Sequence, residues 1–200
     1  YYGVMSVLID NWRKLFDEPD LPFIIAQLPI FLKERDYPTE SGWAQLRDVQ
    51  LKLSQTIPYV GLGVNIDLGE WNDIHPLDKK DVGYRLMLQA EKLAYGNTRI
   101  IADGPVYESY QREGNKYILS FREGTNDFLP VDEVKGFALA GADGVYKWAE
   151  ARIENGKVVV WSDEVAEPVQ LRYAWADNPG AINLRNRAGL PASPFQIACP

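Results

Sequence analysis

The spacing of apolar residues changes once along the chain, near Thr98, and this change constrains the fold more than any other feature. Before it, apolar side chains recur at helical spacing in three segments. After it, they alternate with polar side chains, which is typical of half-buried strands. The sequence therefore predicts two domains, residues 1–97 and residues 98–200.

Residues 1–97 alternate between helical and strand patterns. Helices are predicted for 1–16, 43–57 and 76–95, the last opened by Pro76, and apolar strands for 23–28 and 59–66. Strands that are apolar on both faces are typical of parallel sheets covered by helices. This predicts an α/β fold with part of a three-layer parallel sheet. Two strands make too small a sheet, so we expect its other strands in a segment upstream of Tyr1, which is no initiator Met.

Residues 98–200 carry the strand patterns, at 116–121, 136–140, 148–153, 157–161 and 169–175. Asn155-Gly156 is the strongest hairpin signal, because both residues accept the positive φ of a tight turn. Further turns are expected at 113–115 and 142–144. The pattern predicts an antiparallel β-sandwich or jelly-roll-like module packed on the α/β part.

Composition excludes several classes of function. A net charge of −7 and a pI near 4.8 argue against a nucleic-acid-binding surface. No apolar run is long enough to span a membrane. With one histidine and a single cysteine, Cys199, the chain has neither a zinc ligand set nor an intrachain disulfide, and we expect no metal or cofactor. Cys199, close to the terminus, is expected to be inert.

The segment Trp71-Asn72-Asp73-Ile74-His75-Pro76 follows a predicted strand and holds the only histidine. Catalytic groups of open α/β sheets collect at the carboxyl ends of strands, where this loop must lie. Pro76 restricts the backbone of His75 and fixes its direction. In an extended backbone, Asp73 and His75 point to the same side, so Asp73 could bind Nδ1 and leave Nε2 free as a base. A solitary loop histidine is more often an ordinary surface or packing residue, and that alternative stays open.

Asp73-Ile74-His75-Pro76, with Lys79-Lys80 and residues 82–86 downstream, resembles the last conserved block of the sialate O-acetylesterases, which are SGNH hydrolases. Further segments that resemble this family lie at 43–50, 66–69, 136–141, 172–175, 183–184 and 189–195. The resemblance covers nearly the whole chain and implies the carboxy-terminal part of such an esterase.

The resemblance implies a serine esterase that removes O-acetyl groups from sialic acids, with His75 as the base and Asp73 orienting its ring. None of the serines present lies in a nucleophile elbow, so the nucleophile is expected in the upstream segment and the 200 residues alone are expected to be inactive. Family habit implies a periplasmic or secreted location.

Two assignments keep alternatives. Many SGNH hydrolases place the acid three residues before the histidine, where this chain has Asn72, so Asp67 and Glu70 are reserve candidates for the acid. Trp71 is a candidate wall for a sugar ring, although most tryptophans are core residues. The competing function is a non-catalytic carbohydrate-binding accessory module, which the aromatic-rich β part favours.

Overall fold

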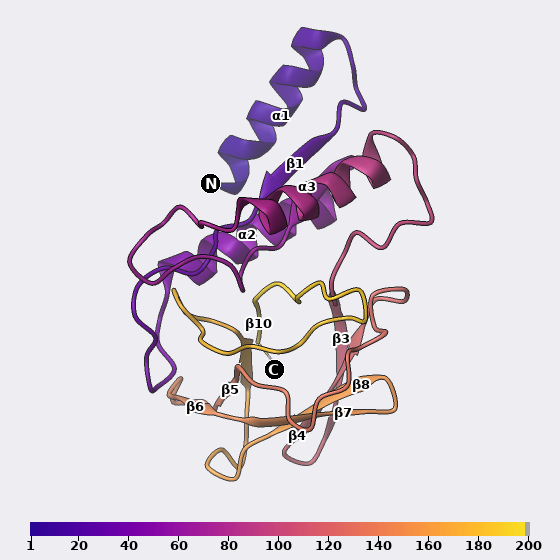
Figure 1. The fold of residues 1–200 in the computed structure, drawn as a ribbon. Helices are drawn as coiled ribbons and strands as arrows, with labels where there is room; N and C mark the ends of the chain where they lie inside the picture. Colours follow the sequence, from indigo (N-terminus) through magenta and orange to yellow (C-terminus); the bar gives the residue numbers. More distant parts are fainter. Residues whose placement is uncertain (199–200) are drawn as a thin grey trace.

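The computed structural model describes residues 1–198 and shows a helical part stacked on a part made of strands (Figure 1). Within the described residues the strands form one parallel pair and two four-stranded antiparallel sheets. The mixed α/β class predicted from the sequence is therefore confirmed. Cys199 lies outside the described residues, and its expected inertness stays a prediction.

Helices and strands alternate through the first part as the sequence predicted. The elements are α1 (Tyr2–Phe16), β1 (Phe23–Ala26), α2 (Gly42–Thr56), β2 (Val60–Gly63) and α3 (Lys79–Leu93). The side chain of Ser41 caps α2 by accepting a hydrogen bond from the backbone of Ala44. Asp78 caps α3 in the same way, so this helix begins after Asp78 and the expectation that Pro76 opens it was wrong.

The parallel pair β1–β2 is covered by helices on both faces. On one face Ile9 of α1 and Leu53 of α2 share a small core with the strands. On the other face α3 lies so close that a Cβ added to Gly61 would stand 2.8 Å from Leu93 Cδ1. Glycine at position 61 therefore allows the helix to approach the strand this closely. Two strands form only part of a sheet, so the complete three-layer SGNH arrangement stays a prediction.

The second part begins at β3. Its strands are β3 (Tyr107–Glu113), β4 (Lys116–Phe121), β5 (Phe137–Ala140), β6 (Tyr146–Trp148), β7 (Glu150–Glu154), β8 (Lys157–Trp161), β9 (Gln170–Tyr173) and β10 (Phe195–Ala198). The predicted strand 148–153 is divided at Ala149, because β6 and β7 belong to different sheets. Asn155 and Gly156 have φ of 50° and 74° and form the expected hairpin between β7 and β8.

Two sheets enclose the main core of the molecule. Their strand orders are β10-β9-β5-β6 and β3-β4-β8-β7. Phe137 and Tyr173 from the first sheet and Leu119 and Val158 from the second are completely buried in one core. Antiparallel sheets that share a core in this way have the packing of a β-sandwich.

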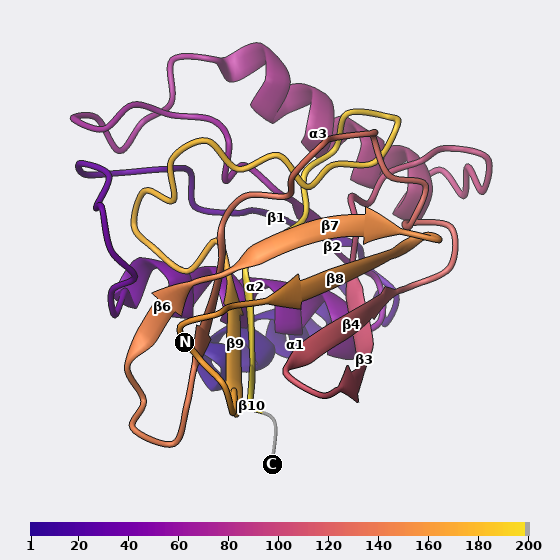
Figure 2. The same cartoon turned by 90° about the horizontal axis from the view of Figure 1, so that it is seen from below.

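The two parts are joined by buried polar contacts, and α2 lies next to β10 (Figure 2). Arg47 of α2 is completely buried and donates to the backbone oxygens of Leu28, Pro29, Ala176 and Asp177. Burial lowers the pKa of Arg47 to about 9, so the guanidinium stays charged at neutral pH. These contacts hold the two parts together, so the parts are not seen as separate domains. The domain boundary near residue 97 stays a prediction.

Candidate active site

The loop between β2 and α3, residues 64–78, starts at the carboxyl end of β2, as the sequence predicted. Its first half is buried: Ile66 is completely enclosed, and the backbone oxygen of Leu68 accepts a hydrogen bond of 3.0 Å from Ile30. Its second half, from Trp71 to His75, is exposed. The buried first half of the loop therefore holds an exposed tip, residues 71–75.

Asp73 and His75 lie together at this tip. The Oδ1 atom of Asp73 accepts a hydrogen bond of 2.8 Å from the backbone of His75 and lies 3.2 Å from its Nδ1. In the tautomer with the proton on Nδ1, the ring donates to Asp73 and Nε2 is free to act as a base. The His75 side chain is 82% exposed, which leaves the ring open to a further group.

The backbone N–H of His75 is the main cause that lowers the pKa of Asp73, followed by the hydrogen bond and charge of the imidazole. The carboxylate is therefore ionised at neutral pH, as an acceptor for Nδ1–H must be. Among the three acids weighed from the sequence, Asp73 is the one that the structure brings to the ring.

Glu70 closes the loop on itself. Its carboxylate accepts hydrogen bonds of 3.3 and 3.4 Å from the backbone of Leu77, and its backbone oxygen accepts one from Asp73. The carboxylate thus connects the two ends of the exposed tip.

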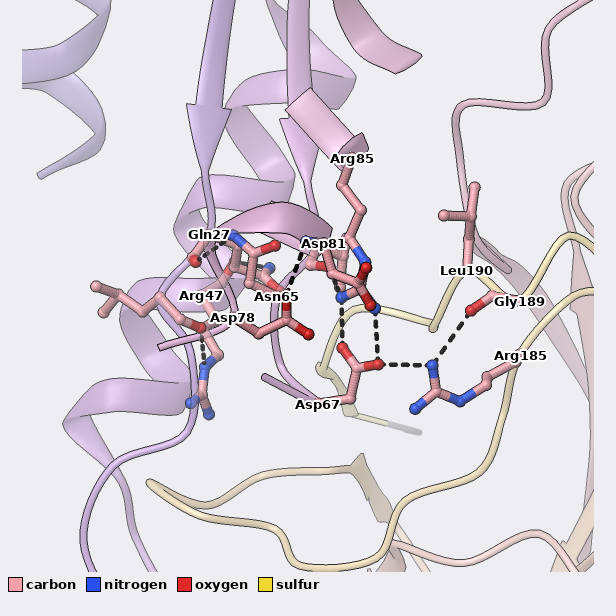
Figure 3. Close-up of polar contacts among 12 residues, drawn as sticks. Gln27, Arg47, Asn65, Asp67, Asp78, Asp81, Arg85, Arg185, Gly189 and Leu190 are labelled. Atoms are coloured by element: carbon pink, nitrogen blue, oxygen red, sulfur yellow. Dashed lines mark hydrogen bonds and ion pairs between the residues drawn. The ribbon is translucent and has the colours of Figure 1, made fainter. Parts of the chain in front are cut away.

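Asp67, the other reserve candidate, is held by two arginines (Figure 3). Arg85 of α3 binds both carboxylate oxygens, at 2.5 and 2.8 Å, and Arg185 of the second part lies 2.6 Å from Oδ2. Burial alone would raise the pKa of Asp67, but the hydrogen bonds and charges of the two arginines outweigh it and lower the pKa. The Asp67 carboxylate is therefore held by both arginines at the start of the loop.

Trp71 is 53% exposed and lies against the loop that follows β1. The ammonium of Lys33 stands 5.3 Å from its ring centroid, a cation–π contact. The loops after both parallel strands thus meet at Trp71, and a sugar-binding role for Trp71 stays a prediction.

Two buried amides at the carboxyl ends of the parallel strands were missed from the sequence. Gln27 donates from Nε2 to Ser193 Oγ at 2.7 Å, and Asn65 donates from Nδ2 to the backbone oxygen of Gln27 at 3.2 Å. Within residues 1–198, Gln27 Oε1 and Asn65 Oδ1 are buried acceptors without a hydrogen-bond partner. The signal was a polar residue near the end of an otherwise apolar run. Through Ser193, the segment before β10 is thus bound to the α/β part.

Comparison with known proteins shows that this chain is similar to esterases, although no family model matches it. Sialate O-acetylesterases from Homo sapiens and Pongo abelii are 27% identical over 218 residues, which cover 98% of this chain and 42% of theirs. The crystal structure of a carbohydrate acetylesterase from Xanthomonas citri shares 40% identity and a TM-score of 0.90, over 98% of this chain and 46% of that one. The resemblance to the sialate O-acetylesterases is confirmed.

The similarity to sialate O-acetylesterases includes both parts of the molecule, because it covers 98% of the chain. The β part is therefore shared with these esterases, together with the loop that carries His75. The chain spans less than half the length of these sialate O-acetylesterases, which leaves room for the segment expected upstream.

Proposed function

We propose that this chain is the carboxy-terminal part of a carbohydrate esterase that removes O-acetyl groups from sialic acids or related acetylated sugars. The observation that carries the proposal is the exposed imidazole of His75, with Nδ1 beside the Asp73 carboxylate, at the carboxyl end of a parallel strand. The similarity to sialate O-acetylesterases and to a carbohydrate acetylesterase supports the same chemistry.

In the proposed reaction, His75 Nε2 takes the proton from a serine hydroxyl as that oxygen attacks the acetyl carbonyl. The tetrahedral intermediate collapses, and the imidazolium returns its proton to the departing sugar oxygen. Water, deprotonated by the same imidazole, then attacks the acyl-serine, and the imidazolium returns that proton to the serine oxygen as acetate leaves. Asp73 holds the Nδ1–H tautomer and stabilises the imidazolium in both halves of the reaction.

The serine and the oxyanion-binding groups are proposed to lie in the upstream segment. Two surfaces of the first part suit its docking. Within residues 1–198, β1 pairs with β2 on one side only, so its other edge is open to a further strand. Helix α1 exposes apolar side chains along its outer face, namely Val4, Val7, Trp12, Leu15 and Phe16. An upstream segment that completes the sheet would cover both surfaces.

The same proposal makes the 200 residues inactive alone, because His75 then lacks a serine. By resemblance to the family, the protein is proposed to be periplasmic or secreted. No helix within residues 1–198 is long and apolar enough to cross a bilayer.

The function is tested by following acetate release from O-acetylated sialic acid and other O-acetylated sugars, using the protein with its upstream segment. We expect acetate release that a serine-directed fluorophosphonate abolishes. Absence of release from every acetylated sugar, or release that the reagent leaves unchanged, would contradict the proposal.

A second candidate, the carbohydrate-binding accessory module, is favoured by an open cavity of about 240 Å³ between the loop after β1 and the β part. Tyr37 and Trp148 line it together with Glu34, Arg35 and Lys135. Aromatic rings beside charged groups suit the faces and hydroxyls of a sugar. The indole N–H of Trp148 donates to the backbone of Asp36 at 2.9 Å, which fixes the ring at the cavity rim.

Sugar binding without hydrolysis separates this candidate from the esterase. Tryptophan fluorescence would be titrated with O-acetylated sialic acid, for the unmodified protein and for Trp148→Ala. Binding that Trp148→Ala weakens, in a protein that contains no upstream serine block and releases no acetate, would favour the accessory module.

A further inference from the structure

A buried ionic cluster joins Asp67, at the start of the His75 loop, to α3 and to the β part (Figure 3). Asp67 and Arg85 are less than a tenth exposed, and Arg185 is 28% exposed. Three contacts of 2.5 to 2.8 Å connect the single carboxylate to the two guanidinium groups. Removing Asp67 would leave both guanidinium groups without a counter-charge, whereas removing Arg185 would leave the Asp67–Arg85 pair and take away only the contact to the β part.

This cluster fixes both ends of the loop. Asp67 stands at the start of the loop, three residues after Val64, and Arg85 belongs to α3, the helix that the loop enters. Arg85 also donates to the backbone oxygen of Val64 at 2.6 Å. The loop that presents His75 is thus a closed ring, which runs from β2 to α3 and back through the ion pair.

Arg185 reaches the ring from the β part and is itself oriented. It donates to the backbone oxygen of Gly189 at 3.2 Å. The neighbouring Asn186 accepts from the backbone of Leu190 at 3.0 Å and donates to the backbone of Asp103 at 2.9 Å. The guanidinium of Arg185 is therefore held by a tight turn of the β part.

We infer that Arg185 is a positioning residue of the active site, through which the β part holds the His75 loop by way of Asp67. The inference rests on the proposed function, because a positioned imidazole matters only if it acts as a base. It gives the β part a role in catalysis besides stability. Positioning matters to rate because a displacement of about 1 Å can cost roughly 100-fold.

A second ionic cluster offers a matched control. Asp103 lies 2.6 Å from Lys92 of α3 and 3.0 Å from Arg122 of the β part, so it also joins helix to β part through one carboxylate and two cations. Asp103 follows α3, whereas Asp67 precedes it. Arg122→Ala therefore removes a comparable contact without touching the start of the loop.

The test compares Arg185→Ala with Arg122→Ala in the protein with its upstream segment. The tautomer of His75 is read from imidazole ¹⁵N shifts, assigned by difference from His75→Gln, and kcat and KM are measured for an aryl acetate. For Arg185→Ala we expect the shifts to move from the Nδ1–H form toward those of free imidazole. We also expect kcat to fall about tenfold with KM changed less than about twofold. For Arg122→Ala, the ¹⁵N shifts of His75 and kcat should match those of the unmodified protein when the two proteins are compared at the same folded fraction.

Equal shifts and equal kcat in the two variants would overturn the inference. If Arg185→Ala does not fold, Arg185→Gln, which keeps one amide donor but loses the charge, decides in its place. Unmodified shifts and kcat in Arg185→Gln would overturn the inference, whereas Arg185→Lys should restore part of the loss. A protein that does not hydrolyse the aryl acetate but still shows the tautomer change in Arg185→Ala would refute the esterase proposal. The inference that Arg185 positions the His75 loop would stand.

Discussion

The two parts of the molecule bury their apolar residues differently. The β part encloses a large core between two sheets, with Phe137, Leu139 and Leu171 completely buried. The α/β part has a small core around Ile9 and Leu53 and leaves one face of α1 exposed. A self-contained core beside an uncovered helix fits the proposal that the β part is the scaffold and that an upstream segment completes the α/β part.

The contact between the parts is also distinct from either core. It is built from buried polar groups such as Gln27, Ser41 and Arg47, which hydrogen-bond across it. Polar contacts of this kind fix relative orientation strictly, because each one needs a defined geometry. Four variants test this division between scaffold, junction and uncovered face.

The largest expected effect is in the scaffold. Phe137→Ala removes a completely buried ring from the centre of the β core and should lower the free energy of unfolding by about 3–5 kcal/mol. The measurement is urea denaturation followed by circular dichroism. A loss below about 1 kcal/mol would show that the β core is not the scaffold.

The junction should come next. Arg47→Met leaves the backbone oxygens of Leu28 and Ala176 without their donor and should cost about 3 kcal/mol. Arg112→Met, at an exposed position of β3, is the control and should change stability by less than about 0.5 kcal/mol. Similar losses in the two variants would mean that the junction contributes nothing specific.

Acid should weaken the same junction through Asp67. Its pKa is lowered from the ordinary 3.8, so its contribution to stability is present above that pH and is lost as pH falls through the lower folded-state pKa. Asp67→Asn lacks this contribution. We therefore expect the stability difference between the unmodified protein and Asp67→Asn to shrink below pH 3.8, as measured by thermal unfolding at several pH values. A difference that is constant down to the lowest pH at which both proteins fold would contradict the assignment.

The smallest effect is expected on the uncovered face. Leu15 is 78% exposed, so Leu15→Ser should change the stability of the 200 residues by less than about 0.5 kcal/mol. In the protein with its upstream segment the same change should cost more, since the proposed docking buries this face. Equal small losses in both proteins would remove this support for a docked segment.

The sequence predicted the parts of the fold that have local causes. The hairpin at Asn155-Gly156 follows from the positive φ of both residues, and the helices of the first part follow from apolar spacing. Strand β3 was missed because most of its residues are exposed, and β10 because it is short and near the chain end. The division at Ala149 depends on which sheet each strand joins, which local pattern does not contain.

The candidate site followed the same rule. The approach of Asp73 to His75 is local, and alternation of side chains before Pro76 was enough to predict it. The role of Asp67 was not predictable, because Arg185 is distant in sequence and reaches Asp67 only after the β part has folded. The buried amides of Gln27 and Asn65 were missed for a similar reason, since their burial depends on packing between elements.

The most direct test of the account is the rate of acetate release by His75→Ala in the protein with its upstream segment. As the proposed base, His75 should contribute at least about 100-fold to kcat/KM for an aryl acetate. The account predicts a loss of that size in a variant that folds normally, since the His75 side chain is exposed. A rate close to that of the unmodified protein would contradict it.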